Sequence, residues 1–214
     1  MQLDIRTGHA QTVEKVLSWL SESALAGVTV CDVRASPACV NRLTPPQAGC
    51  GTGSLAIPLA LRGAAVSASD ISSSMAGEAQ RRYEESLAAG GSAPSVPPRF
   101  FTSDLESVTG RFDTVTCLDV MIHYPQAKAD AMVQHLASLA ERRLIISFAP
   151  KTLAYSILKR IGELFPGPSK ATRAYLHAEA DVEAAAAAVG WKVVRREMTA
   201  TNFYFSRLLE FARA

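Results

Sequence analysis

Residues 48–54 read Ala-Gly-Cys-Gly-Thr-Gly-Ser and directly precede a helix-like stretch at 54–62. The glycine motif, Gly49, Gly51 and Gly53, lets a backbone turn tightly from a strand into a helix and approach a ligand without Cβ clashes. Ser54 occupies the position at which the dinucleotide-binding fingerprint has its third glycine. The motif therefore predicts a ligand-binding strand-to-helix turn and disfavours a nicotinamide or flavin dehydrogenase.

Short apolar runs alternate with helix-like segments around this turn. Strands are expected at 28–32, 65–69, 99–103, 112–118 and 144–148, and helices at 11–26, 54–62, 72–89, 126–140, 152–164 and 179–189. This alternation predicts an α/β fold with a doubly wound, Rossmann-like and mostly parallel sheet. The last two strands, 192–198 and 202–211, are joined by only three residues, which permits only an antiparallel hairpin.

Composition places the chain among ordinary globular proteins. Its 214 residues suit a single domain over 1–214, and no run approaches the roughly 18 apolar residues of a membrane span. The four cysteines show no metal-site spacing, so no metal is expected. The net charge of +2 disfavours nucleic acid as a partner. Residues 141–214 nevertheless carry 12 basic against 7 acidic side chains, which suits either a polyanionic substrate or solvated helix faces.

Aspartates end three successive predicted strands. Asp70, Asp104 and Asp119 follow the second, third and fourth strands, and ligands of such sheets bind outside the carboxyl ends of the strands. We expect Asp70 to accept both hydroxyl protons of a ribose. Asp104 is placed to accept a hydrogen bond from an adenine amino group, while Leu105 offers its backbone amide. Cofactor-binding positions are therefore predicted at Gly49, Cys50, Gly51, Gly53, Asp70, Ile71, Asp104, Leu105 and Asp119.

An α/β sheet that ends in an antiparallel hairpin resembles the class I S-adenosylmethionine-dependent methyltransferases. Within that class, several segments resemble the magnesium-protoporphyrin IX methyltransferase family of chlorophyll biosynthesis. The matching segments are 2–12, 48–59, 66–72, 118–126, 147–152, 165–177 and 202–209. The resemblance implies S-adenosyl-L-methionine as cofactor and methylation of one propionate of a magnesium porphyrin.

The same resemblance assigns substrate-side roles. His123 is expected to be the catalytic residue that orients the propionate, against the alternative of a structural histidine. Tyr124 would pack on the macrocycle or in the core, and Lys170 and Arg173 would hold the second propionate or simply lie on a surface loop. Three further residues, Arg6, His9 and Thr12, are expected to precede the first helix and lie over the methionine end of the cofactor.

Residues 33–47 depart from the family pattern, because Asp32 should directly precede Ala48 there. We expect this irregular insertion, which either is a real loop or reflects a splicing error, to displace Asp32 or to bulge out. An N-terminal arm and a targeting segment are expected to be absent. The resemblance further implies a chloroplast protein with peripheral contact to plastid membranes and contact with magnesium chelatase. The alternatives are another class I methyltransferase and a non-catalytic or incomplete product.

Overall fold

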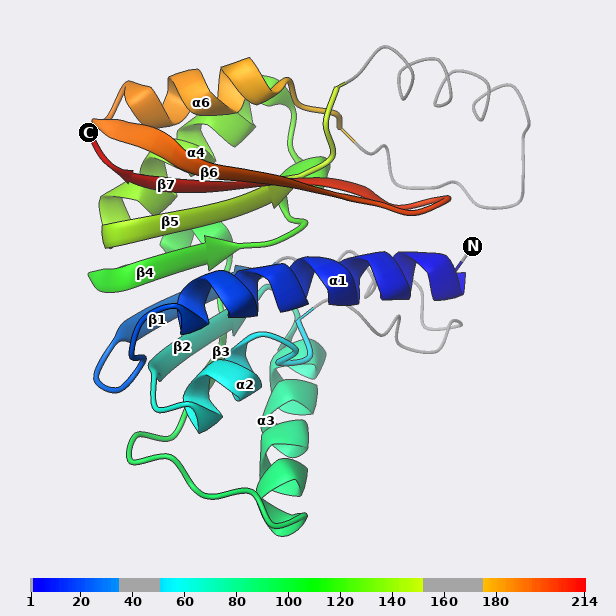
Figure 1. The fold of residues 1–214 in the computed structure, drawn as a ribbon, viewed down its shortest axis with the longest axis vertical. Helices are drawn as coiled ribbons and strands as arrows, with labels where there is room; N and C mark the ends of the chain where they lie inside the picture. The colour runs from blue at the N-terminus through cyan, green and yellow to red at the C-terminus, as the bar shows by residue number, and fades with distance from the viewer. Residues whose placement is uncertain (1, 35–50, 152–174) are drawn as a thin grey trace.

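The computed structural model describes residues 2–34, 51–151 and 175–214, apart from the side chains of Gln2 and Arg34. Its centre is a seven-stranded sheet with the order β3-β2-β1-β4-β5-β7-β6 (Figure 1). The strands are β1 Thr29–Arg34, β2 Ala65–Asp70, β3 Arg99–Thr102, β4 Phe112–Cys117, β5 Ala140–Phe148, β6 Trp191–Ala200 and β7 Phe205–Arg213. The described helices are α1 Gln2–Ser21, α2 Ala56–Leu61, α3 Ser73–Ala88, α4 Gln126–Leu139 and α6 Glu179–Ala187, with short 3-10 turns η2 Leu105–Ser107 and η3 Met121–His123.

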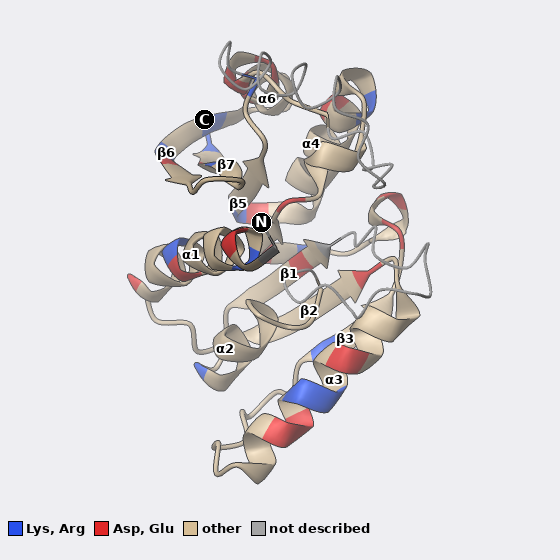
Figure 2. Ribbon diagram, turned by 90° about the vertical axis from the view of Figure 1, so that its right-hand side faces the viewer, with Lys and Arg blue, Asp and Glu red and all other residues tan. Residues whose placement is uncertain are grey.

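Strand directions confirm the predicted α/β class. The pairs β1–β2, β1–β4, β2–β3 and β4–β5 are parallel. Strand β7 runs antiparallel to both β5 and β6, so the chain ends in the predicted hairpin. The carboxyl ends of the five parallel strands therefore share one edge of the sheet, which faces the viewer in Figure 2.

Alternating side chains on the strands build two apolar layers, one on each face of the sheet. On one face, α1 and α2 pack through residues such as Val16, Trp19 and Leu59. Helix α3 extends this layer, because its Tyr83 ring lies 6.4 Å from the ring of Phe100 in β3. On the other face, α4 and α6 cover the sheet. With both faces covered, ligand access is left to the strand ends.

Strand β1 ends two residues later than predicted. Val33 pairs with Ser69 of β2 and Cys117 of β4, and its side chain is fully buried. Because Val33 continues the alternation of Cys31 on the α4 and α6 side, the strand runs on through Arg34. The predicted insertion at 33–47 therefore starts inside the sheet, and its residues 35–47 lie outside the described part of the chain.

Helix α1 begins at Gln2 and not at Gln11, so the prediction that Arg6, His9 and Thr12 precede the first helix is wrong. The reason is tertiary: the Asp4 carboxylate accepts hydrogen bonds from the Thr201 hydroxyl at 2.6 Å and the Phe203 amide at 2.7 Å. These contacts attach the first turn of α1 to the tip of the β6–β7 hairpin. Local periodicity at 2–10 could not show them.

The middle of the same helix approaches the hairpin closely. A Cβ atom on Gly8 would overlap the Tyr204 ring, so glycine allows the two elements to touch. One turn later, the buried Thr12 hydroxyl lies 3.0 Å from the Thr199 hydroxyl and 3.0 Å from the Tyr204 hydroxyl. The helix is thus attached to the hairpin by hydrogen bonds at Asp4 and Thr12 and by the close approach at Gly8.

We expect Thr12→Val to lower the free energy of unfolding by about 1–2 kcal/mol, because a buried hydrogen-bond network loses one member. Thr7→Val is the matched control: Thr7 is exposed and its hydroxyl donates only within the helix, to the Leu3 carbonyl at 3.0 Å. Its effect should stay within about 0.5 kcal/mol. Urea denaturation of both variants measures the difference, and equal effects would show that the buried contacts do not hold α1 in place.

Candidate active site

The glycine loop is pressed against the end of β2. Gly51 has φ 67° and Gly53 has φ 80°, a backbone region that favours glycine. A Cβ atom on Gly51 would overlap the Asp70 carboxylate, and one on Gly53 would lie 2.7 Å from the Ile57 side chain. Both the conformation and the space at these positions therefore require glycine. The loop is therefore the tight turn without side chains at these two positions that the glycine motif predicts.

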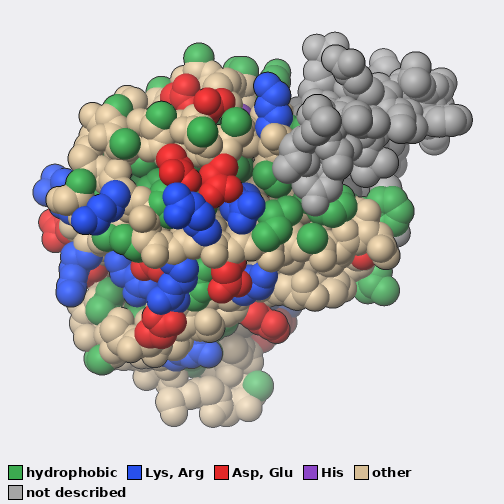
Figure 3. Space-filling view, turned by 45° about the horizontal axis from the view of Figure 1, so that its top comes forward, with side chains coloured by type: hydrophobic (Ala, Val, Ile, Leu, Met, Phe, Trp, Pro, Cys, Tyr) green, Lys and Arg blue, Asp and Glu red, His purple; other side chains and the backbone are tan. Residues whose placement is uncertain are grey.

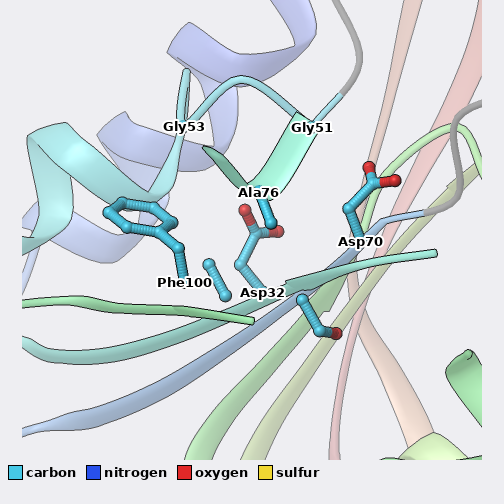
Figure 4. Close-up of a pocket in the computed structure, with 8 residues that line it drawn as sticks. Asp32, Gly51, Gly53, Asp70, Ala76 and Phe100 are labelled. Carbon is cyan, nitrogen blue, oxygen red and sulfur yellow. The ribbon is translucent and has the colours of Figure 1, made fainter. Parts of the chain in front are cut away.

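A pocket lies between this loop and the strand ends (Figure 4). Asp32 from β1 and Asp70 from β2 line it from below, and the glycine loop covers it. The full lining is Asp32, Gly51, Gly53, Ala68, Ser69, Asp70, Ala76 and Phe100. The pocket joins residues from separate segments of the chain, as expected of a ligand site at the carboxyl edge of a doubly wound sheet.

Residues 33–47 were expected either to displace Asp32 or to bulge out. Asp32 is not displaced, so the first of these expectations is wrong. Its side chain is 2% exposed, and its Oδ1 accepts a hydrogen bond from the Thr116 hydroxyl at 2.8 Å. Parallel pairing on both sides of β1 fixes the residue beneath the glycine loop. The Asp32 carboxylate therefore lines the pocket beneath the glycine loop.

Asp70 and Ile71 form the turn from β2 into α3. The Asp70 Oδ1 atom accepts a hydrogen bond from the Ser72 amide at 2.8 Å, and the Ser72 hydroxyl accepts from the Met75 amide as the N-cap of α3. Ser72 is thus the N-cap of α3, and its amide fixes the Asp70 carboxylate at the pocket wall. Ile71 is 53% exposed, so an apolar surface stands next to the carboxylate.

Asp104 and Leu105 lie at the neighbouring strand end, outside the lining of the pocket. The Asp104 carboxylate accepts from the Ser107 amide at 2.7 Å, and hydrogen bonds from Ser107 lower the pKa of this exposed group. The Leu105 side chain is buried in the apolar layer beneath α4. The Ser103 amide donates to the Asp70 carbonyl at 3.0 Å, which holds the two strand ends side by side.

Asp119 is the centre of a part-buried hydrogen-bond cluster that the sequence does not reveal. Its Oδ2 accepts from the Tyr204 hydroxyl at 2.7 Å and lies 2.8 Å from His9 Nδ1. Its Oδ1 accepts from the hydroxyls of Ser147 at 2.8 Å and Ser206 at 3.0 Å. We call Asp119 with these four partners the Asp119 cluster. It joins α1, β5 and the closing hairpin at the end of β4.

Charge and conformation both set Asp119 apart. Burial alone would raise its pKa, but the hydrogen bond and charge of His9, with the hydroxyls of Tyr204 and Ser147, lower the pKa to about 2. Its backbone φ is 59°, and among the described residues other than glycine it alone has a positive φ. Aspartate tolerates this region better than most residues, and the cluster holds it there. Both carboxylate oxygens are used inside the protein.

The turn after Asp119 carries His123 and Tyr124. His123 is half-buried at the end of η3, and burial lowers its pKa although the Asp119 charge acts in the opposite direction. The neutral imidazole is therefore favoured near pH 7. Tyr124 is half-buried too, with the Lys128 ammonium 5.1 Å from its ring centre, and burial raises the pKa of its phenol.

The basic residues of the C-terminal part are largely paired where they are described. Arg195 contacts Glu22 at 2.7 Å, Arg196 contacts Glu183 at 2.8 Å, and Arg207 contacts Glu179 at 2.9 Å. Figure 3 shows basic and acidic side chains interleaved on this face. The predicted positions Gly49, Cys50, Lys170 and Arg173 lie outside the described residues. Over the described ranges, no group of three His, Cys, Asp or Glu side chains could hold a metal ion.

Sequence reasoning missed several residues of the site and, for His9, the contact with Asp119. Ala76 of α3 and Phe100, the second residue of β3, line the pocket. Tyr204 and His9 lie 85 and 110 residues from Asp119 in the chain. No local pattern links them, because the contact exists only once α1 and the hairpin meet at the sheet.

Comparison with known proteins covers the whole chain. A family model described as "Magnesium-protoporphyrin IX methyltransferase C-terminus" matches residues 117–213, and one described as "Methyltransferase domain" matches residues 47–142. The chain is 60% identical over 212 residues to the chloroplastic magnesium protoporphyrin IX methyltransferase of Arabidopsis thaliana, covering 98% of this chain and 61% of that protein. The chain thus spans less than two thirds of that relative.

Shorter relatives are covered more fully. The chain is 52% identical to the magnesium-protoporphyrin O-methyltransferase of Synechocystis, covering 100% of this chain and 85% of that protein. A crystal structure of the magnesium protoporphyrin IX methyltransferase from Synechocystis with bound SAH superposes with a TM-score of 0.81 at 50% identity, over 99% of this chain and 86% of that chain. Since identity at this level extends over nearly all of a relative and the family-specific model includes the Asp119–His123 turn, the chain belongs to the magnesium-protoporphyrin IX methyltransferase family.

Proposed function

We propose that this chain transfers the methyl group of S-adenosyl-L-methionine to one propionate carboxylate of magnesium protoporphyrin IX, giving the monomethyl ester and S-adenosylhomocysteine. The observation that carries the proposal is the pocket in which the Gly51–Gly53 loop faces the Asp32 and Asp70 carboxylates. Solved Synechocystis relatives hold SAH or SAM, which supports the cofactor. We infer one methyltransferase domain over 1–214.

The residues present fit the adenosyl part of this cofactor. A side chain at Gly51 would overlap the Asp70 carboxylate, so the loop backbone lies directly beside the group that would hold the ribose. The Asp70 carboxylate at the pocket wall is an acceptor for two ribose hydroxyls. We assign Ile71, Asp104 and Leu105 to the adenine end, and the amides of Gly49 and Cys50 to the loop contact. When bound, the cofactor supplies a methyl group activated on a sulfonium.

Methyl transfer to a carboxylate needs little acid–base chemistry. A propionate is already ionised at neutral pH, so the new bond forms between a propionate oxygen and the methyl carbon as the carbon–sulfur bond breaks, and no proton moves. His123 is assigned to orient the carboxylate through a hydrogen bond from its neutral ring. The Tyr124 ring would lie against the macrocycle. Lys170 and Arg173 would hold the second propionate.

We also propose a chloroplast location with peripheral contact to plastid membranes. The Arabidopsis relative is named chloroplastic, which supports the compartment. Two exposed apolar residues support membrane contact: Leu3, 76% exposed, precedes Asp4 in α1, and Phe203, 58% exposed, donates its amide to the Asp4 carboxylate. Within the described ranges, no helix has the length and hydrophobicity to cross a bilayer. Contact with magnesium chelatase is proposed from family resemblance alone.

Asp70→Asn should weaken binding of S-adenosylhomocysteine by about 1.5–3 kcal/mol, roughly tenfold or more, because one charge-assisted acceptor for the ribose is lost. The substitution keeps an oxygen for the Ser72 amide, so the fold is expected to persist. Asp181→Asn removes an equal charge on α6, on the other face of the sheet, and should leave affinity unchanged. Calorimetric titration with a melting curve measures both effects, and unchanged affinity in Asp70→Asn would remove Asp70 from the site.

His123→Phe should lower kcat for methylation of magnesium protoporphyrin IX by about a hundredfold while the affinity for S-adenosylhomocysteine stays the same, because an orienting contact acts on the reacting geometry. His135→Phe is the matched control, since His135 lies on α4 with its Nε2 3.1 Å from the Val108 carbonyl oxygen. Chromatography of the ester measures turnover. Wild-type turnover in His123→Phe contradicts the assigned role, and no ester from the unsubstituted chain contradicts the function itself.

A further inference from the structure

His177 is a buried histidine that the proposed chemistry does not use. It lies just before α6 and is 0% exposed. Its amide donates to the Ala149 carbonyl at 3.0 Å, and its carbonyl accepts from the Lys151 amide at 2.7 Å, so the backbone continues the edge of β5. The ring packs at 78° to the Phe148 ring, with 6.5 Å between centres. From sequence alone this residue looks ordinary.

Both nitrogens of the His177 ring face oxygen atoms. Nε2 lies 2.8 Å from the carbonyl oxygen of Met121, and Nδ1 lies 2.9 Å from Oε1 of Gln126. A backbone carbonyl oxygen can only accept, so Nε2 carries a hydrogen. The protonation of Nδ1 then depends on which way the Gln126 amide is turned.

The orientation of the Gln126 amide is fixed by its second contact. Its Nε2 donates to the Asp130 carboxylate at 2.7 Å, one helical turn further along α4. Turning the amide over would place its oxygen against the ionised carboxylate, where two acceptors would repel each other. Gln126 therefore presents its oxygen to His177, and Nδ1 must donate as well. A ring that donates from both nitrogens is the imidazolium.

We infer that His177 is held as a buried imidazolium and acts as a positioning residue for the turn that carries His123. The positioning role, unlike the protonation state of His177, rests on the function proposed above for His123. The ring hydrogen bond to Met121 is reinforced by the Tyr175 amide, which donates to the Ile122 carbonyl at 2.8 Å. The segment before α6 therefore binds two successive carbonyls of the turn.

Charge around the ring is compatible with this state. Burial of a cation is costly unless every donor has a partner, and both ring donors here have one. Asp130 supplies the countercharge through Gln126, which offsets the unfavourable position of a cation near the beginning of α4. The packed elements carry further titratable groups. On α4 these include Lys128, bound to Glu106, and His135; on α6 they include Asp181, Glu183 and Glu179, which is bound to Arg196. His123 and Tyr124 lie at the turn, and Lys151 follows β5.

Nitrogen-15 NMR of the four histidine rings tests the protonation state without any substrate. The His177 nitrogens are expected to show the equivalent, protonated signature of imidazolium at pH 7. His135 in the same spectrum is the internal reference, because a ring with one acceptor needs only one hydrogen. A neutral tautomer of His177 at pH 7 overturns the inference.

Asp130→Asn tests the link between the charge and the turn. The introduced side-chain amide can donate to the Gln126 oxygen, so the Gln126 amide can turn and give its hydrogens to His177 Nδ1, and the ring is expected to become neutral. The His123 ring signals should shift with it, and kcat should fall roughly tenfold at unchanged affinity for S-adenosylhomocysteine. Glu84→Gln, which removes an acidic charge on the remote helix α3, should change none of these readings.

The outcomes separate the two proposals. If Asp130→Asn neutralises His177 but leaves the His123 signals and kcat as in the unsubstituted chain, the positioning role is wrong. If His177 remains imidazolium in Asp130→Asn, the hydrogen-bond argument through Gln126 is wrong. If the unsubstituted chain forms no ester, the proposed function fails, while the ring signals of His177 and His123 still decide whether His177 sets the turn.

Discussion

The part-buried carboxylate of Asp119 is the interaction on which the geometry of the site depends. Asp119 lies two residues after β4 in a left-handed backbone conformation, and both of its oxygens bind side chains of α1, β5 and the closing hairpin. A charged group with these partners has little freedom, because any shift would leave a part-buried acceptor unpaired. Two residues later begins the 3-10 turn with His123. The cluster therefore fixes where the turn starts relative to α1 and the hairpin.

The turn is held from its other side by His177, so two separate parts of the chain define its path. Asp119 fixes its beginning, and the segment before α6 binds the Met121 and Ile122 carbonyls. The cofactor pocket is built differently, from the glycine loop and the ends of β1 and β2. Cofactor binding and acceptor positioning thus rest on different contacts, which explains why substitutions are expected to separate affinity from turnover.

Sequence patterns predicted the elements whose signals are local. Apolar runs located the strands, a helix was expected over 72–89 where α3 forms, and the short final connection required a hairpin. The first nine residues of α1 were missed because their partners, the hairpin tip and Tyr204, are about 200 residues away. For the same reason the contacts of His9 with Asp119 and of His177 with Met121 could not be predicted, whereas the places of Asp70 and the glycines could. Motifs at strand ends predict a pocket, whereas hydrogen bonds between distant residues can be identified only in the folded chain.

Hydrogen–deuterium exchange of Asp119→Asn tests the central role of the carboxylate most directly. Asparagine tolerates the left-handed conformation, so the substitution removes charge while the backbone can stay in place. If the Asp119 cluster joins the helix to the turn, amide exchange should accelerate both at residues 8–12 of α1 and at residues 120–124, with the rest of the sheet unchanged. Faster exchange in only one of these segments, or in neither, would contradict the account.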